Sequence, residues 1–236
     1  MPNSDITLLT ATLSNDKAIA YYDSGPVIGS TSFTTLVLLH GFHFNSRGFI
    51  HLFPLASQFN LRLILAVRRD YEGSTRYTDA EISTLGSESP FNFFAEAGGL
   101  LAEFLYYLVK NTKVCEATKD RLAGGIAVAG WSLGSVFAQT MFYERTPIDE
   151  KTYTLIEPYV LSLILIDPPH CALGIPIPPE YGHLFFPPDI IKDSEELKQS
   201  FRRWVTCYYD HDTGLDGARL SKLDSREVTE NCIFET

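Results

Sequence analysis

Short apolar runs alternate along this chain with stretches in which apolar residues recur at helical spacing. The runs are rich in Val, Ile and Leu and are bounded by Gly, Pro, Asn or Asp, a pattern that is typical of strands. Strands are predicted over residues 6–13, 17–22, 35–39, 61–67, 125–129 and 159–166. Since helical stretches separate most of these runs, the pattern predicts an α/β fold with a mostly parallel sheet, buried on both faces.

Helical spacing is found in three parts of the chain. It runs over 47–59, where Pro54 predicts a bend, from Ser89-Pro90 to about Lys110, and over 133–143. Gly98 and Gly99 lie inside the second of these helices, and we expect them to loosen its middle.

The segment Gly130-Trp131-Ser132-Leu133-Gly134 follows a predicted strand and precedes a predicted helix. This is the G-x-S-x-G pattern, in which a sharp strand-to-helix turn strains the serine and raises its hydroxyl above the sheet. Only very small residues fit two positions before and after the serine. The bare pattern also occurs by chance in loops, but the flanking strand and helix favour a nucleophilic Ser132.

A second motif, His40-Gly41-Phe42-His43, follows the strand predicted over 35–39, and a segment of the D-x-x-G-x-S kind begins at Asp70. Together with the serine motif, these segments resemble the α/β-hydrolase superfamily in its esterase- and lipase-like branch. The resemblance implies that the backbone N–H groups of Phe42 and Leu133 form an oxyanion hole. It favours a structural role for His40 over that of a catalytic base.

The resemblance covers residues 6–210 and then departs from the family pattern, in which an acid and a histidine follow two further strands. Residues 220–236 are too polar and too short to supply both strands, so we expect the C-terminal strands to be missing. Asp167 is a candidate acid or a turn cap. The candidate bases are His170, His183 and His211, each of which also fits an ordinary loop position.

The resemblance divides the chain into a hydrolase core over 1–167 and a cap or lid with a C-terminal tail over 168–236. Residues 168–188 are rich in Pro and aromatic residues, and Asp193 with Glu196 begins a capped helix that we expect to end near Tyr209. An ordinary core helix is the alternative interpretation.

Composition narrows the range of partners. The chain has 236 residues, 45% of them apolar, which suits one core domain with a small cap. Its formal net charge of −10 disfavours nucleic acid and anionic membranes and favours a neutral or lipophilic small molecule. Because no secretory signal or membrane-spanning run is present, we expect a cytoplasmic protein. The four cysteines are widely spaced, so neither a metal site nor a disulfide framework is indicated, and no cofactor is implied.

The sequence therefore predicts a serine hydrolase that transfers the acyl group of a small or lipophilic ester to water through Ser132. We expect feeble turnover, because a serine without a positioned base is a weak nucleophile and the strands that carry the family's acid and histidine are expected to be missing. An epoxide hydrolase is disfavoured, since relatives of that kind carry aspartate at the position of Ser132. The alternative is a non-catalytic relative that binds a ligand or partner.

Overall fold

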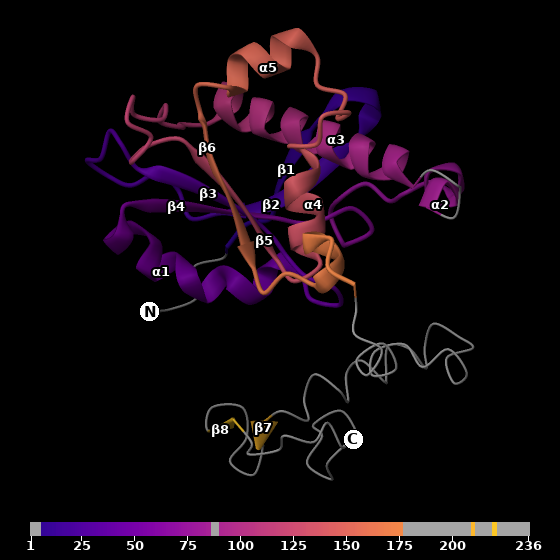
Figure 1. Cartoon of the computed structure of the whole chain (residues 1–236). Helices are drawn as coiled ribbons and strands as arrows, with labels where there is room; N and C mark the ends of the chain where they lie inside the picture. The colour runs from indigo at the N-terminus through magenta and orange to yellow at the C-terminus, as the bar shows by residue number, and fades with distance from the viewer. Residues whose placement is uncertain (1–5, 86–89, 177–208, 211–218, 221–236) are drawn as a thin grey trace. The chain divides into compact units, whose positions relative to one another are not determined.

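The computed structural model describes residues 6–85, 90–176, 209–210 and 219–220. The chain divides into two compact units, residues 1–174 and residues 175–236. Figure 1 shows the first unit, in which helices lie against a central sheet. The predicted boundary between 167 and 168 stays a prediction.

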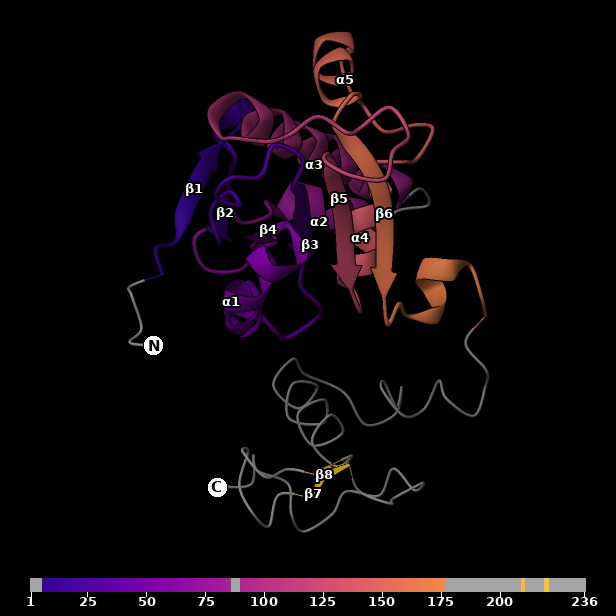
Figure 2. The same cartoon turned by 90° about the vertical axis from the view of Figure 1, so that its left-hand side faces the viewer.

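The first unit is built on a six-stranded mixed sheet with the strand order β1-β2-β4-β3-β5-β6 (Figure 2). The strands β4, β3, β5 and β6 run parallel to one another. The strand β2 pairs antiparallel with both of its neighbours, β1 and β4. The majority of the strand pairs are therefore parallel, as predicted. The strands are β1 (Leu9–Thr12), β2 (Ala18–Asp23), β3 (Thr34–Leu39), β4 (Leu61–Ala66), β5 (Ile126–Trp131) and β6 (Val160–Ile166).

The helices are more numerous than predicted; α3 (Phe91–Asn111) matches the helix predicted from Ser89-Pro90 to about Lys110, whereas the other two predicted helices are broken up or shorter. The α-helices are α1 (Phe53–Ala56), α2 (Asp79–Leu85), α3 (Phe91–Asn111), α4 (Gly134–Thr140) and α5 (Glu150–Ile156). The 3-10 helices are η1 (Ser14–Asp16), η2 (Ser46–Leu52), η3 (Ser57–Phe59) and η4 (His170–Leu173). The single helix predicted over 47–59 is thus a succession of η2, α1 and η3, and the helix predicted over 133–143 is limited to α4. The pattern analysis did not predict α2 or α5.

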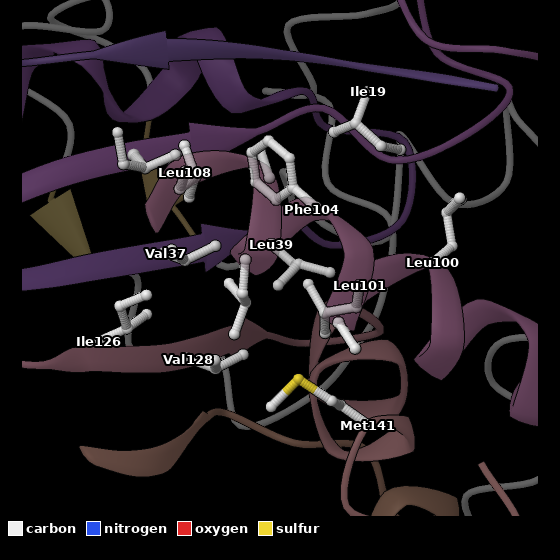
Figure 3. Close-up of a cluster of buried hydrophobic side chains, with 14 of the residues drawn as sticks. Ile19, Val37, Leu39, Leu100, Leu101, Phe104, Leu108, Ile126, Val128 and Met141 are labelled. Atoms are coloured by element: carbon white, nitrogen blue, oxygen red, sulfur yellow. The ribbon is translucent and has the colours of Figure 1, made fainter. Parts of the chain in front are cut away.

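Two apolar clusters fill the two faces of the sheet, because successive residues of a strand point to opposite sides. Leu38 and Leu65 pack toward η2 and α1, whereas Val37 and Leu39 pack toward α3 and α4. The larger cluster is drawn in Figure 3, where labelled side chains of β2, β3 and β5 meet those of α3 and Met141. Its labelled members are Ile19, Val37, Leu39, Leu100, Leu101, Phe104, Leu108, Ile126, Val128 and Met141.

The strand β6 is the last strand of the described sheet, and it departs from the expected burial. Ser162, Ile164 and Ile166 alternate along one face of β6 and are exposed, the two isoleucines to about 40%. The expectation that the sheet is buried on both faces therefore holds for its central strands and is wrong at this edge.

The two central glycines of α3 do not loosen the helix, which is continuous from Phe91 to Asn111. A Cβ atom added at Gly98 would lie 2.4 Å from the carbonyl oxygen of Thr140 in α4. Gly98 is thus required for the close approach of α3 and α4, and the expectation of a loosened middle is wrong.

The second unit contains the short strands β7 (Tyr209–Asp210) and β8 (Arg219–Leu220), which pair antiparallel. Most of the helix predicted from Asp193 lies outside the described residues, but its expected end at Tyr209 falls in β7. In the described part of the chain, no helix is long and apolar enough to cross a membrane. Nor do the described residues include three or more His, Cys, Asp or Glu side chains grouped so that they could hold a metal ion.

Candidate active site

Ser132 occupies a sharp turn between β5, which ends at Trp131, and α4, which begins at Gly134. Its φ angle is +51°, a left-handed backbone conformation that residues other than glycine rarely adopt. The Ser132 N–H donates to the carbonyl oxygen of Ile166 in β6 at 2.8 Å, which ties the turn to the neighbouring strand. Its half-buried side chain makes no hydrogen bond within the described residues. This strained strand-to-helix turn, called the elbow below, has the geometry that the G-x-S-x-G pattern predicts.

The glycines on either side of Ser132 are required by the backbone that crosses over them. A Cβ atom at Gly130 would lie 2.3 Å from the carbonyl oxygen of Gly134, and one at Gly134 would lie 2.3 Å from the carbonyl oxygen of Leu39. Even a methyl group at either position therefore collides with main-chain atoms. The spacing that singled out the motif in the sequence has this steric cause.

His40 begins the turn after β3 and is completely buried. Its Nε2 accepts the backbone N–H of Arg68 at 3.1 Å, so Nδ1 carries the proton and donates to the carbonyl oxygen of Gly41 at 3.0 Å. Burial, reinforced by the Arg68 cation, lowers the pKa of His40 to about 4. A neutral imidazole with both nitrogens engaged has a structural role, and His40 is not available as a base for Ser132.

Tyr71 holds the other side of this turn. Its hydroxyl accepts the backbone N–H of His43 at 3.1 Å, and its ring lies edge-on to His40 with the ring centroids 4.3 Å apart. The His43 side chain is half-buried, with its ring 4.0 Å from the ring of Phe42. Sequence reasoning missed Tyr71 as an organiser of the turn, because nothing in the pattern relates residue 71 to residues 40–43.

The turn passes directly beside Ser132. A Cβ atom added at Gly41 would lie 3.1 Å from the Ser132 Cβ and 3.2 Å from the Trp131 ring. The predicted oxyanion-hole residues therefore both lie next in sequence to this close approach: Phe42 follows Gly41, and Leu133 follows Ser132. Neither Phe42 nor Leu133 lies in a helix or strand. Convergence of their N–H groups on one point stays a prediction.

Asp167 directly follows β6 at the same sheet edge as Ser132, because the parallel register places Trp131 opposite Ile166. Asp167 is exposed and has a φ angle of +47°. His170 is also exposed and begins η4. The Gln139 side chain of α4 donates to the Ala172 carbonyl oxygen of η4 at 2.9 Å, and this hydrogen bond links η4 to α4. His183 and His211 lie outside the described residues.

The loop after β4 is held by hydrogen bonds of its charged residues. Arg69 forms a forked ion pair with Glu81 of α2, with N–O distances of 2.6 and 3.0 Å, rather than with its sequence neighbours Asp70 and Glu72. This pair holds the pKa of Glu81 well below its usual range. Asp70 instead accepts the backbone N–H of Tyr77 at 2.8 Å, which gives it a structural role within the loop.

A cavity of about 50 Å³ lies beneath the loop, against α3 and α4. Its lining is mainly apolar and includes Arg68, Tyr77, Leu100, Phe104 and Phe137. A space of this size holds about one or two water molecules. Ser132 does not line it, so this cavity is not a substrate pocket for the elbow.

Comparison with known proteins gives matches among solved structures only. No family model matches the chain, and no curated protein matches it. The epoxide hydrolase CorEH is 18% identical with a TM-score of 0.50, and the match covers 86% of this chain and 61% of that one.

Two further matches come from other hydrolases. An epoxide hydrolase of the α/β-hydrolase superfamily from hot-environment metagenomes is 19% identical, with a TM-score of 0.45, and the match covers 70% of this chain and 43% of that one. An esterase from Exiguobacterium antarcticum is 16% identical with a TM-score of 0.43, and the corresponding shares are 69% and 46%.

The chain therefore spans between 43% and 61% of the length of these three structures. At such low identity the likeness concerns the fold alone. The mixed sheet, the strand-to-helix turn at Ser132 and the match to CorEH together show that the chain has the α/β-hydrolase fold.

Proposed function

We propose that the chain is a serine hydrolase of the α/β type that acts on small or lipophilic esters. The observation that carries the proposal is the conformation of Ser132, strained at φ +51° in the turn between β5 and α4. Such strain is stored where the surrounding structure holds a residue for function. A serine at this position favours acyl transfer over epoxide opening, because the resemblance implies aspartate there in epoxide hydrolases.

In the proposed reaction the Ser132 hydroxyl attacks the ester carbonyl while a histidine accepts its proton. The N–H groups of Phe42 and Leu133 bind the oxyanion that forms on the carbonyl oxygen, a contribution of about 3–4 kcal/mol per donor in measured cases. Collapse of this intermediate releases the alcohol and leaves an acyl group on Ser132. Water then attacks the acyl group, and the acid product leaves.

Proton transfer is the weak step of this scheme. Asp167 is the proposed acid, and His170, His183 and His211 are the candidate bases. Since nothing in the described part of the chain hydrogen-bonds the Ser132 hydroxyl, we expect feeble turnover. An oxyanion hole and substrate binding alone leave a residual rate roughly 10³–10⁴-fold above that in water. The net charge of −10 supports a neutral or lipophilic substrate, and a cytoplasmic location is part of the proposal.

The test is hydrolysis of p-nitrophenyl acetate by the purified chain and by Ser132→Ala. Ser57→Ala is a matched control, because Ser57 is exposed and lies on the α1 side of the sheet. We expect slow turnover that Ser132→Ala abolishes and Ser57→Ala leaves unchanged. Equal rates for the wild type and Ser132→Ala would contradict the proposal.

Single alanine variants of His170, His183 and His211 then identify the base. The variant whose rate falls to the level of Ser132→Ala marks it. Fast turnover that depends on one of these histidines would show that the expectation of a feeble enzyme is wrong, while supporting the serine mechanism.

A further inference from the structure

Arg68 is a half-buried cation that lies against two aromatic rings. It follows β4 and lies beside the turn of residues 40–43, yet no Asp or Glu in the described part of the chain forms an ion pair with it. Its guanidinium lies against the Tyr71 ring at 5.2 Å and against the Phe137 ring at 4.9 Å. The Nε atom is buried and has no hydrogen-bond partner there. A buried unpaired donor of this kind calls for an explanation.

The hydrogen bonds that Arg68 does make converge on one peptide group. Its Nη2 donates to the Gly41 carbonyl oxygen at 3.1 Å and to the Tyr71 hydroxyl at 3.3 Å. The same carbonyl oxygen accepts the Nδ1–H of His40 at 3.0 Å. The Gly41 carbonyl is therefore held by two donors, one of which carries a full charge.

This carbonyl belongs to the same peptide group as the N–H of Phe42. Because a trans peptide is planar, its C=O and N–H point in opposite directions. Donors that hold the Gly41 carbonyl oxygen therefore also fix the direction of the Phe42 N–H, away from Arg68. A cation at the carbonyl oxygen further polarises the peptide, which makes the N–H a stronger donor.

We infer that Arg68 is a positioning residue for the oxyanion hole: it locks the Gly41–Phe42 peptide in the orientation in which the Phe42 N–H serves as a donor. The inference rests on the proposed function, since it assigns a role within the same site. A Cβ atom added at Gly41 would lie only 3.1 Å from the Ser132 Cβ, so a rotation of the Gly41–Phe42 peptide acts close to Ser132. Arginine suits the task because its Nη2 donates to both the carbonyl and the Tyr71 hydroxyl while the planar guanidinium lies against two rings.

The experiment compares the wild type with Arg68→Met, Arg68→Lys and Arg47→Met. Methionine keeps the length and apolar packing, whereas lysine keeps the charge and loses the planar guanidinium that lies against the two rings. Arg47 is exposed in η2 and serves as the control. We expect Arg68→Met to lower kcat for p-nitrophenyl acetate about 10²-fold, the size of a misplaced catalytic group, with little change in KM. Arg68→Lys should lose less, and Arg47→Met should match the wild type.

A second readout does not depend on turnover. In protein labelled with ¹⁵N-phenylalanine, the Phe42 amide resonance, assigned with Phe42→Leu, should move in Arg68→Met and stay in place in Arg47→Met. If the wild type shows no turnover that depends on Ser132, the proposed function fails, while this resonance still tests whether Arg68 orients the peptide. An unmoved Phe42 resonance in folded Arg68→Met and Arg68→Lys would overturn the inference. A raised KM with unchanged kcat would also overturn it, because Arg68 would then act on the substrate.

Discussion

The substitution Gly134→Ala tests the steric origin of the elbow. The new methyl carbon would lie 2.3 Å from the carbonyl oxygen of Leu39 and 2.7 Å from that of His40, whereas ordinary van der Waals contacts begin near 3.4 Å. The backbone of β3 and of the following turn would therefore have to move by about 1 Å. Overpacking of this kind costs about 1–3 kcal/mol, and we expect the upper end, because main chain rather than a flexible side chain opposes the methyl group.

The measurement is the free energy of unfolding in urea, supported by the melting temperature. A loss of about 3 kcal/mol lowers the melting temperature by roughly 6–12 °C in a chain of this size. Gly48→Ala is the matched control, since a Cβ atom at Gly48 would meet nothing within 4 Å. Gly48→Ala should leave stability unchanged or raise it by up to about 1 kcal/mol. If Gly134→Ala unfolds like Gly48→Ala, the tight crossing of Gly134 and β3 does not exist.

Three further predictions concern stability and association. Asp23→Asn should lower the free energy of unfolding in urea by about 3–5 kcal/mol, because loss of the Asp23 charge leaves the buried Arg62 cation uncompensated. In the wild type, Arg62 donates to the Asp23 carboxylate through Nε at 2.9 Å and Nη2 at 2.5 Å. An unchanged free energy of unfolding would be contrary evidence. Because Arg69 depresses the pKa of Glu81, the stabilisation from this pair is present above the usual pKa of 4.5 and is lost as the pH falls; Glu81→Gln should thus be less stable than the wild type at pH 7, with a smaller difference at pH 3. Ile164→Lys on the exposed face of β6 should reduce light scattering at high protein concentration, because charges at an edge strand oppose edge-to-edge pairing; equal scattering would refute this.

The elbow could be predicted from sequence because its motif is local. A strand, a serine between two glycines and a helix follow one another within the range 125–143, so the motif can be recognised there. Gly130 is required by the Gly134 carbonyl oxygen in the same segment, whereas the need for Gly134 comes from the distant carbonyl oxygens of Leu39 and His40. The structural role of His40 was also predicted, and its two hydrogen bonds and lowered pKa confirm it.

The short helices α2 and α5 were missed, although each carries a capping signal. Before α2, Thr78 and Glu81 exchange hydrogen bonds, with the Glu81 carboxylate accepting the Thr78 N–H and the Thr78 hydroxyl accepting the Glu81 N–H. At the start of α5, the Asp149 carboxylate accepts the Thr152 N–H. Each helix has only seven residues, too few for the apolar periodicity to stand out.

The roles of Arg68 and Tyr71 could not be predicted, because they arise from packing between distant segments. Both side chains meet the turn of residues 40–43 across about 28 positions of sequence, and only the parallel pairing of β3 and β4 brings them there. The pairing of Arg69 with Glu81 instead of its acidic neighbours has the same origin, because it requires the fold of the loop leading to α2.

The most direct test of the account is whether Ser132 is a nucleophile. The folded chain is treated with a fluorophosphonate, digested, and analysed by mass spectrometry for the modified residue. The account predicts a single phosphonyl adduct on Ser132, absent from Ser132→Ala and from chain unfolded in urea before treatment. An unlabelled Ser132 in the folded chain, or equal labelling after unfolding, would contradict it.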